Sequence, residues 1–251
     1  MNICIDVGNS TIGVGVYDNN SLVERMTFNT DVRLTEDEFY HLFKKPELTN
    51  IAVENIIYSS VVPQINVPML NALKRLFNTT PMLIGPGTKT GLAIKVDNPL
   101  EIGNDLIADL VAAKEKYGYP SLIADLGTAS KILLLDKSGT FVSCLIMPGL
   151  TLSAESLSSR AALLPEVSLI APASVLAKNT LGAMNAGIVY GHADMIIGLI
   201  NRIEKELGYP CKHLLTGGGA VYVKEILGDD FIYDKNLNLD GLNIIINKNN
   251  K

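Results

Sequence analysis

Short apolar runs that alternate with polar positions predict three strands over residues 2–28. The first run, ICIDV, contains Asp6 and leads into a glycine and small polar residues. The second, IGVGVYD, is closed by the turn sequence DNNS at 18–21, and LVERMTF alternates after it. The same plan returns at 121–147, where SLIADL, ILLLD and TFVSCLIM follow one another, with the turn sequence DKSG at 136–139. The chain therefore carries two copies of one three-strand meander.

Apolar residues at helical spacing alternate with further short strands between and after the two meanders. The predicted helices are 34–45, the segment from Pro68 to Phe77, 98–118, 150–160, 180–207, 217–227 and 238–247. The predicted strands are 55–62, 81–85 and 211–216. Strands mixed with helices in both halves predict an α/β architecture. Because the meander recurs over far more than the roughly 50 residues of a solenoid repeat, we expect duplicated domains, 1–118 and 119–251.

The predicted helix over 98–118 carries signals at both ends. Asn98 is a natural N-cap, Pro99 suits the first helical position, and Glu101 completes a pattern like a capping box. Gly118 suits the C-terminal end. The domain boundary is expected just after it, in the sequence YGYP.

The composition is that of an ordinary acidic protein, with 251 residues, 47% hydrophobic residues and a net charge of −5. No Lys/Arg cluster suggests a nucleic-acid or polybasic membrane surface, so we expect neither partner. Cys4, Cys144 and Cys211 have no metal-ligand spacing and are expected as free thiols. Asp6 interrupts the first apolar run, which argues against a signal peptide. No uncharged apolar stretch reaches the roughly 18 residues of a spanning helix, so we expect a cytoplasmic protein.

Each meander begins with an Asp-x-Gly segment, at Asp6 and at Asp125. A glycine between two strands can take positive φ, and its missing side chain lets a phosphate approach the backbone. The N–H groups of such a turn bind anions, and an aspartate at a strand end could hold Mg²⁺ through water. A single copy is equally explained as a common turn. Two copies on matching hairpins favour phosphate binding.

Two such hairpins, one in each domain, could grip the phosphates of one nucleotide from both sides. That plan resembles the actin–hexokinase–sugar kinase superfamily. The sequence TGGGA at 216–220 is similar to the Gly-rich turn that this superfamily places near adenosine. It is equally compatible with a flexible loop between a strand and a helix.

Asp105 and Asp109 lie four positions apart in the predicted helix over 98–118 and so share one helical face. A carboxylate in a cleft could accept the proton of an attacking hydroxyl, a role worth about 10²–10⁴-fold in rate. Acidic residues in a first turn also stabilise the helix dipole while facing solvent. Spacing alone favours this second interpretation and does not choose between the two residues. Asn179 or Thr180 is a natural N-cap for the helix over 180–207.

Eight motifs in order resemble the type III pantothenate kinase family over roughly residues 1–225. They are DVGNST at 6–11, NPLEIGND at 98–105, DLGTA at 125–129, MPG at 147–149, LPEVSL at 164–169, KNT at 178–180, AGIVYG at 186–191 and TGGGA at 216–220. An ordered set of this size is far more specific than any one of its members.

This resemblance implies duplicated actin-like (ribonuclease H-like) domains, each a mixed sheet with a three-strand meander flanked by helices. It implies a homodimeric transferase, a kinase that phosphorylates pantothenate with ATP to 4′-phosphopantothenate, the first step of coenzyme A biosynthesis. The cofactors implied are ATP, Mg²⁺ and a monovalent cation, K⁺ or NH₄⁺.

The resemblance also implies roles for individual residues. Asp105 would be the general base, Asp125 would hold the monovalent cation, and Thr128 would contact ATP. Asp6 would hold Mg²⁺ through water. The residues implied at the ATP phosphates are Asp6, Val7, Gly8, Asn9, Ser10, Thr11, Ile12 and Gly13. The residues implied at pantothenate are Gly103, Asn104, Asp105, Leu106 and Thr180.

The chain departs from the family pattern at positions that bear on the acceptor. Leu106 stands where the family usually has Arg, which would pair with the pantothenate carboxylate. A charged hydrogen bond contributes about 1.5–3 kcal/mol, or about 10- to 150-fold in affinity. Many members also have a Tyr near the position of Val96, which this chain lacks. Residues that could supply the missing positive charge are Lys89, Lys95, Lys131 and Arg160.

Further departures follow the second Asp-x-Gly segment. Ser130 and Lys131 replace Thr-Thr, and Ser143 and Cys144 replace Gly-Gly. Lys131 brings an ammonium group near the second phosphate segment, which raises the hypothesis that it replaces the monovalent cation. The nucleotide half thus keeps the family pattern, while the acceptor half is altered.

Two alternatives to pantothenate phosphorylation follow from these departures. The chain could phosphorylate another small hydroxy compound, or it could be a catalytically altered paralogue that acts as a nucleotide-binding or regulatory protein. Leu106 and Val96 favour the alternatives. The retained aspartates and Thr128 favour an active kinase.

Overall fold

The computed structural model describes residues 1–250, which fall into two compact units. The first unit consists of Met1–Leu92, Asp97–Glu115 and the C-terminal segment that begins at Asn236. The second consists of Ala93–Val96 and Lys116–Lys235. Each unit has its own mixed sheet with flanking helices, so the predicted α/β class with a duplicated sheet is confirmed.

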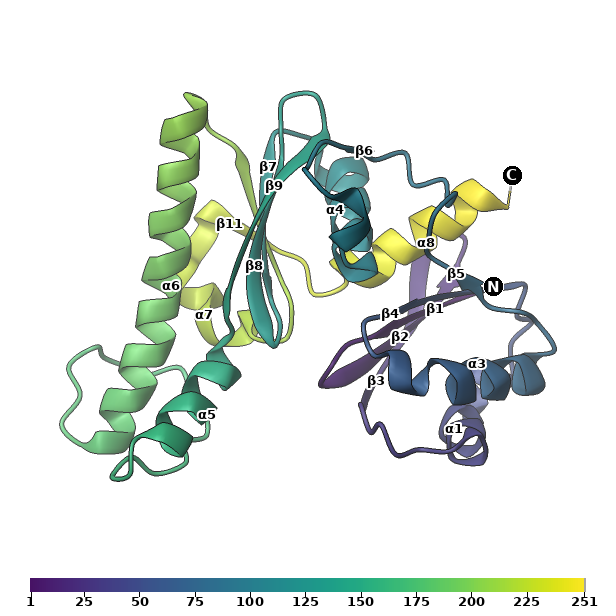
Figure 1. Ribbon diagram of the computed structural model, residues 1–251, viewed down its shortest axis with the longest axis horizontal. Helices are drawn as coiled ribbons and strands as arrows, with labels where there is room; N and C mark the ends of the chain where they lie inside the picture. Colours follow the sequence, from purple (N-terminus) through teal and green to yellow (C-terminus); the bar gives the residue numbers. More distant parts are fainter. Residues whose placement is uncertain (251) are drawn as a thin grey trace. The chain divides into compact units, whose positions relative to one another are not determined.

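The sheet of the first unit has the strand order β3-β2-β1-β4-β5 (Figure 1). Its strands are β1 (Asn2–Val7), β2 (Thr11–Asp18), β3 (Ser21–Asn29), β4 (Asn55–Ser60) and β5 (Met82–Leu83). β2 pairs antiparallel with both β1 and β3, whereas β4 runs parallel to β1 and to β5. The meander predicted over residues 2–28 is therefore confirmed.

Helices cover both faces of this sheet (Figure 1). On one face, α1 (Glu36–Phe43) and α3 (Pro63–Phe77) bury Phe39, Phe43 and other apolar side chains against the strands. The short α2 (Pro46–Thr49) adds Leu48 to the same core. The opposite face is covered by α4 (Asn104–Tyr117) and α8 (Leu237–Asn249), which pack on Cys4, Tyr17 and Ile57.

The C-terminal helix lies with the first unit, although the sequence-based division at residue 118 assigns it to the second domain. α8 packs against β1, β2 and β4. Its buried apolar side chains are Leu237, Leu239, Leu242, Ile245 and Ile246. Periodicity shows that this helix has an apolar face, but only the fold determines which sheet buries that face.

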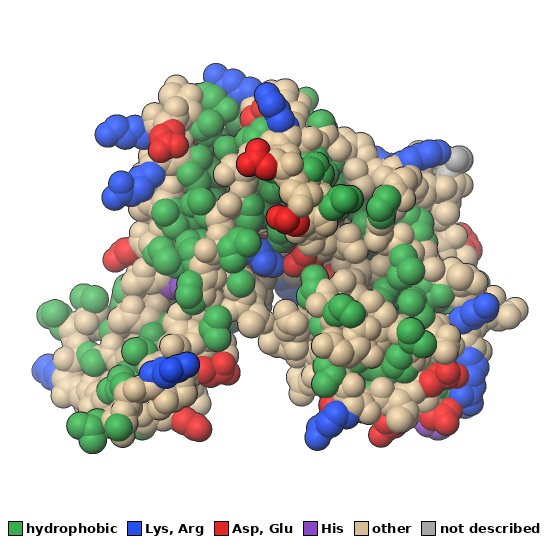
Figure 2. Space-filling view, in the orientation of Figure 1, with side chains coloured by type: hydrophobic (Ala, Val, Ile, Leu, Met, Phe, Trp, Pro, Cys, Tyr) green, Lys and Arg blue, Asp and Glu red, His purple; other side chains and the backbone are tan. Residues whose placement is uncertain are grey.

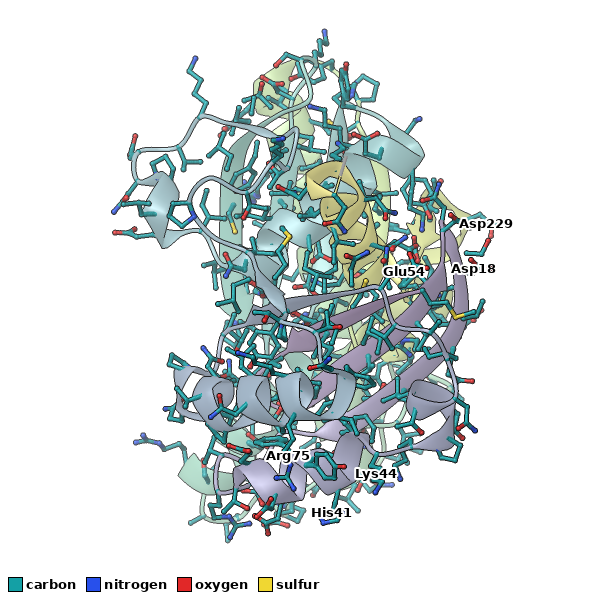
Figure 3. The ribbon with its side chains drawn as sticks, turned by 90° about the vertical axis from the view of Figure 1, so that its right-hand side faces the viewer. Asp18, His41, Lys44, Glu54, Arg75 and Asp229 are labelled. Atoms are coloured by element: carbon teal, nitrogen blue, oxygen red, sulfur yellow. The ribbon has the colours of Figure 1, made fainter. Side chains whose placement is uncertain are left out.

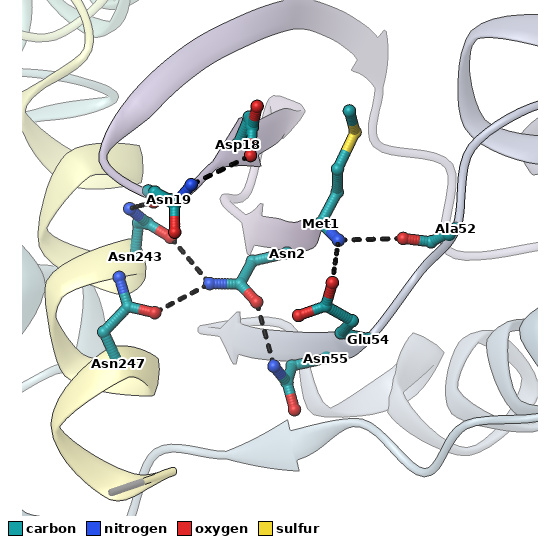
Figure 4. Close-up of polar contacts among 9 residues, drawn as sticks. All are labelled: Met1, Asn2, Asp18, Asn19, Ala52, Glu54, Asn55, Asn243 and Asn247. Carbon is teal, nitrogen blue, oxygen red and sulfur yellow. Dashed lines mark hydrogen bonds and ion pairs between the residues drawn. The ribbon is translucent and has the colours of Figure 1, made fainter.

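A network of asparagines ties α8 to the sheet (Figure 4). The Asn2 amide donates to Asn243 Oδ1 at 3.0 Å and to Asn247 Oδ1 at 2.9 Å. Asn55 donates to Asn2 Oδ1 at 3.0 Å, and Asn243 donates to the Asn19 carbonyl at 2.8 Å. Asn2 and Asn243 are buried, and buried amides are stabilised only when they are hydrogen-bonded. The network therefore selects one position of α8 on the sheet.

Two helices of the first unit differ from their predicted limits. α3 begins at Pro63 rather than after Pro68, because Pro63 occupies the first helical position and Pro68 removes only one hydrogen bond early in the helix. The helix predicted over 98–118 is broken. Asn98 caps a 3₁₀ turn, η1 (Pro99–Glu101), and α4 starts afresh at Asn104 after an extended Ile102.

The outer surface of α1 and α3 carries a small charged and aromatic cluster. The Arg75 guanidinium of α3 lies 4.3 Å from the centre of the Tyr40 ring and 2.6 Å from Asp37 Oδ1. Arg75, His41 and Lys44 lie together at this surface in Figure 3. These exposed contacts join α3 to α1.

The sheet of the second unit repeats the design of the first. Its strand order is β11-β10-β7-β8-β9-β6. Its strands are β6 (Ala93–Ile94), β7 (Ser121–Leu126), β8 (Ala129–Leu135), β9 (Thr140–Pro148), β10 (Lys212–Thr216) and β11 (Phe231–Tyr233). The antiparallel meander β7-β8-β9 corresponds to β1-β2-β3, and the parallel β10 and β11 correspond to β4 and β5. The second predicted meander is therefore confirmed, and β6 is an added edge strand.

The helices of the second unit are α5 (Leu150–Arg160), α6 (Thr180–Leu207) and α7 (Ala220–Leu227), followed by the 3₁₀ turn η2 (Gly228–Asp230). α6 begins and ends as predicted, with Asn179 as its N-cap and a left-handed Gly208 after it. It is long and apolar enough to cross a membrane by composition alone. Half of its most apolar window is buried within the unit, as in the core helix of a globular domain.

Candidate active site

The first Asp-x-Gly segment forms a tight hairpin loop between β1 and β2. The Gly8 N–H donates to the Thr11 carbonyl at 2.9 Å. Thr30 closes the loop from β3's end: its hydroxyl donates to the Gly8 carbonyl at 2.7 Å, and its N–H donates to the Ser10 carbonyl at 3.0 Å. Asn9, Ser10 and Thr11 are exposed at the tip. The hydrogen bonds of Thr30 thus fix the loop, which exposes its polar residues to solvent.

Gly8 is needed for lack of space, and not for the positive φ that the sequence suggests. It does not take positive φ. A Cβ at this position would lie 3.2 Å from the Thr11 carbonyl oxygen, tighter than ordinary contacts. Among the other residues implied at the ATP phosphates, Val7 and Ile12 have fully buried side chains in the sheet core. Their side chains shape the strands and do not face a ligand.

Asp6 is half-buried near the end of β1, between Gly13 of β2 and Ser59 of β4. The nearby Ser10 and Thr11 hydroxyls add further oxygen donors at the loop tip. Mg²⁺ prefers oxygen ligands and retains most of its waters, so this donor chemistry fits a Mg²⁺ ion held through water.

The first turn of α4 presents Asp105, and two side chains fix this turn. The Asn104 amide donates to the Ile84 carbonyl at 3.1 Å, and the Asn238 amide of α8 donates to the Asp105 carbonyl at 3.0 Å. Asp105 Oδ1 folds back over Gly103, where any Cβ would clash with it. Gly103 therefore allows the conformation that Asp105 adopts.

The structure distinguishes Asp105 from Asp109, which sequence spacing alone leaves equivalent. Asp109 is 2% exposed, whereas Asp105 is half-buried at the helix start. Only Asp105 can meet a hydroxyl that arrives from solvent. Leu106, where the family pattern has Arg, is 8% exposed and belongs to the buried side of the same helix.

The second Asp-x-Gly segment connects β7 to β8. Asp125 and Lys131 lie directly opposite each other in the antiparallel register of these strands. Lys131 Nζ donates to Asp125 Oδ2 at 3.1 Å. Their side chains are only 17% and 13% exposed, respectively. Asp125 therefore already has a cationic partner from its own sheet, so its carboxylate is a poor fit for an added monovalent cation.

Two backbone segments of the second unit, one with Gly149 and one with Gly217 and Gly219, pack on the loop at 126–128. The Gly149 N–H donates to the Thr128 carbonyl at 3.0 Å, and the Gly219 N–H donates to the Leu126 carbonyl at 2.7 Å. A Cβ at Gly149 would clash with the Gly127 and Thr128 carbonyls. Gly217, at φ +88°, packs on the backbone of Leu126, where a Cβ would lie 2.6 Å away.

This convergence explains why the MPG and TGGGA motifs accompany the second Asp-x-Gly segment. Glycines allow these two segments and the loop to pack backbone to backbone, and the exposed Thr128 lies where they meet. Of the residues assigned to the second unit, Thr128 and Asp125 belong to this one loop region. Thr180 lies elsewhere, exposed in the first turn of α6.

One pair in the second unit is absent from the sequence predictions. The buried Ser130 hydroxyl lies 2.7 Å from His192 Nε2 of α6. Burial lowers the pKa of His192 from its usual 6.5. An isolated histidine in an apolar helix carries no signal for its partner, so the sequence could not indicate this contact.

The second unit also has an apolar groove between α5 and α6, of about 730 Å³. Its lining includes Leu152, Leu157, Met184, Ile188 and Met195. Hydrophobic side chains gather on the surface over α5 and the following segment, at the lower left of Figure 2.

A family model and two full-length relatives point to the same family. Residues 2–202 match the family model described as type III pantothenate kinase. A type III pantothenate kinase of Exiguobacterium sibiricum is 40% identical over 253 aligned residues, which cover 99% of this chain and 100% of the relative. A type III pantothenate kinase of Listeria monocytogenes serotype 4a is 39% identical, and the alignment covers 99% of this chain and 98% of the relative. The crystal structure of an archaeal actin homolog matches with a TM-score of 0.53 at 13% identity, over 99% of each chain. That likeness shows an actin-like fold.

Proposed function

The chain belongs to the type III pantothenate kinase family, and we propose that Asp105 is the general base of its reaction. The enzyme phosphorylates pantothenate with ATP to 4′-phosphopantothenate in the first step of coenzyme A biosynthesis. The observation that carries the role of Asp105 is its position on the fixed first turn of α4, half-buried, while Asp109 is buried. A base in this position removes the proton of the primary hydroxyl as that oxygen attacks the γ-phosphorus.

The two hairpin loops are the proposed phosphate-binding elements. The exposed residues 9–11 at the tip of the first loop and the loop at 126–128 offer N–H groups and hydroxyls to phosphate oxygens. Asp6 would hold Mg²⁺ through water, and Thr128 would contact ATP. When bound, Mg²⁺ supplies charge neutralisation of the phosphates. The Gly-rich turn at 217–219 supports the 126–128 loop through its hydrogen bond to Leu126.

The proposed pantothenate-binding residues are Gly103, Asn104, Asp105, Leu106 and Thr180. Within this set, Asn104 is committed to the Ile84 carbonyl and Gly103 accommodates the Asp105 carboxylate. Leu106 offers no charge to the carboxylate of pantothenate. Outside this set, the basic side chains proposed to pair with the pantothenate carboxylate are Lys89, Lys95 and Arg160, because Lys131 is paired with Asp125.

We also propose a homodimer in the cytoplasm. The apolar groove between α5 and α6 and the exposed Leu152, Leu181 and Ile197 on these helices support association through this face. Of the implied cofactors, ATP and Mg²⁺ match the donors at the first loop. The monovalent cation, K⁺ or NH₄⁺, would compete with Lys131 for Asp125.

The test is ADP release from the purified protein with MgATP and pantothenate, beside Asp105→Asn. We expect pantothenate-dependent release and a loss of about 10²–10⁴-fold in kcat for the variant, with unchanged ATP affinity. Asp229→Asn, an exposed acidic position in η2 labelled in Figure 3, is the matched control and should keep full activity. An Asp105→Asn protein that retains wild-type kcat would remove the proposed base.

A second candidate function is phosphorylation of another small hydroxy compound. The buried apolar Leu106 favours it, because no carboxylate partner stands at this position. Replacing pantothenate by other small hydroxy acids in the same assay tests it. Faster ADP release with another acceptor would support this candidate. ATP binding without turnover on any acceptor would point instead to a regulatory, nucleotide-binding paralogue.

A further inference from the structure

We propose that the Lys131 ammonium takes the place of a monovalent cation at Asp125, so that phosphoryl transfer by this enzyme needs neither K⁺ nor NH₄⁺. This inference rests on the proposed kinase function. It assigns Lys131 as a positioning residue for the second phosphate loop, acting through Asp125.

The position of Lys131 follows from the strand register. Asp125 of β7 and Lys131 of β8 are direct antiparallel partners, and side chains of such partners leave the sheet on the same face. The Lys131 backbone is held on its other side by Ile146 of β9. Because Lys131 lies inside a central strand, its side chain starts from a fixed backbone. Its ammonium reaches Asp125 Oδ2 at 3.1 Å.

Burial makes this pair different from an ordinary surface ion pair. The Lys131 and Asp125 side chains are 17% and 13% exposed. A carboxylate this far from water requires a compensating charge. Lys131 carries the same single positive charge as K⁺ or NH₄⁺ and is tethered to the chain. Its presence does not depend on cation concentration.

A free cation at the same carboxylate would also meet a like charge. Lys131 Nζ lies at hydrogen-bond distance from Asp125, so a second monovalent cation on this carboxylate would lie within a few ångströms of the ammonium. Repulsion at this range is strong where water is largely excluded. The two occupants therefore exclude each other, and the tethered one has the advantage.

The pair lies where it can act on the phosphate loop. Asp125 precedes Leu126, whose carbonyl accepts the Gly219 N–H at 2.7 Å, and Thr128, whose carbonyl accepts the Gly149 N–H at 3.0 Å. Fixing Asp125 thus fixes the start of the loop on which both glycine segments pack. Losing the charge at Lys131 leaves a buried carboxylate without this partner, which a small cation could then replace.

The experiment compares wild type, Lys131→Met and Lys131→Arg at constant ionic strength, with choline replaced stepwise by K⁺ or NH₄⁺. ADP release with MgATP and pantothenate is the first readout. The second is the Kd of a non-hydrolysable ATP analogue with Mg²⁺, measured by calorimetry without acceptor. Lys137→Met is the matched control, because Lys137 lies in the exposed turn after β8 with its ammonium over the Tyr209 ring.

For each of wild type, Lys131→Arg and Lys137→Met, adding K⁺ should change neither kcat nor the Kd of the ATP analogue. Lys131→Met in choline should lose about 10- to 150-fold in kcat or in analogue affinity, the equivalent of one charged hydrogen bond. K⁺ or NH₄⁺ should restore most of this loss. Rescue by a cation distinguishes replacement of a charge from a merely structural contact, which added K⁺ would not repair.

Stimulation of the wild type by K⁺ of tenfold or more, in kcat or analogue affinity, would overturn the inference. So would a Lys131→Met protein that folds but is not rescued by either cation. If Lys131→Met does not fold, the cation titration of the wild type and of Lys131→Arg still decides. Wild type that binds the analogue but never releases ADP would refute the proposed kinase, while the Kd series still tests the role of Lys131.

Discussion

The Ser130 hydroxyl and His192 Nε2 lie 2.7 Å apart inside the second unit. This contact joins β8, directly after the 126–128 loop, to the middle of α6. Burial lowers the pKa of His192 from 6.5, because removal from water disfavours the charged imidazolium. The folded protein therefore favours neutral His192 at its contact with Ser130.

We predict that His192 lowers the stability of the protein in mild acid. The unfolded chain protonates this histidine near pH 6.5, whereas the folded protein does so at lower pH. Between these two values the unfolded state binds more protons, so the free energy of unfolding falls as pH drops below 6.5. His192→Gln cannot titrate and should remove this part of the pH dependence. Melting temperatures across a pH series measure it, with His41→Gln on α1 as control. Parallel curves for wild type and His192→Gln would contradict the prediction.

The close crossing of α4 and α8 predicts a strong effect at Gly241. A Cβ at this position would overlap the Ala108 carbonyl of α4. Gly241→Ala should therefore destabilise the protein by about 1–3 kcal/mol, the usual cost of overpacking. The matched control is Gly198→Ala in α6, where a Cβ meets nothing within 4 Å. This control should be neutral or stabilise by up to about 1 kcal/mol through helix propensity. Urea unfolding of both variants measures the difference. Equal midpoints for the two variants would contradict the close contact between α4 and α8 at Gly241.

Gly217 should be the least replaceable residue of the TGGGA motif. It combines a φ of +88° with backbone contact to Leu126, so Ala is disfavoured by both conformation and space. Gly217→Ala should lower the melting temperature and weaken binding of the ATP analogue. Gly218→Ala adds a Cβ to open space at ordinary φ and should leave the melting temperature unchanged. The opposite order of the two melting temperatures would show that the Gly217 contact does not hold the loop.

The asparagine network predicts a cost for Asn2→Ala. The substitution leaves Asn55 and the buried Asn243 without their shared partner, and an unsatisfied buried group costs about 1–3 kcal/mol. Asn71→Ala on the exposed side of α3 is the control and should be close to neutral. Hydrogen exchange adds a local readout, since α8 should lose protection first in Asn2→Ala. Uniform exchange throughout the first unit would argue against a specific role in anchoring α8.

Much of the fold could be predicted from sequence because it depends on neighbouring residues. Alternation and turn residues specify both meanders, and Asn179 and Gly208 mark the ends of α6. The sequence does not predict the break in the helix over 98–118. Capping signals around Asn98 favour a helix start there, but they do not show that the chain becomes extended at Ile102 before α4.

The sequence by itself determined the order of elements, the duplicated meander and the chemistry of the motifs around Asp6, Asp105 and Asp125. Only the tertiary structure decided that α8 covers the first sheet and that Asp109 is buried while Asp105 is accessible. It also decided that Lys131 reaches Asp125. The physical reason is the range of the interactions. Turns, caps and periodicity are local, whereas burial and charge pairing depend on which distant segments the packed chain brings together.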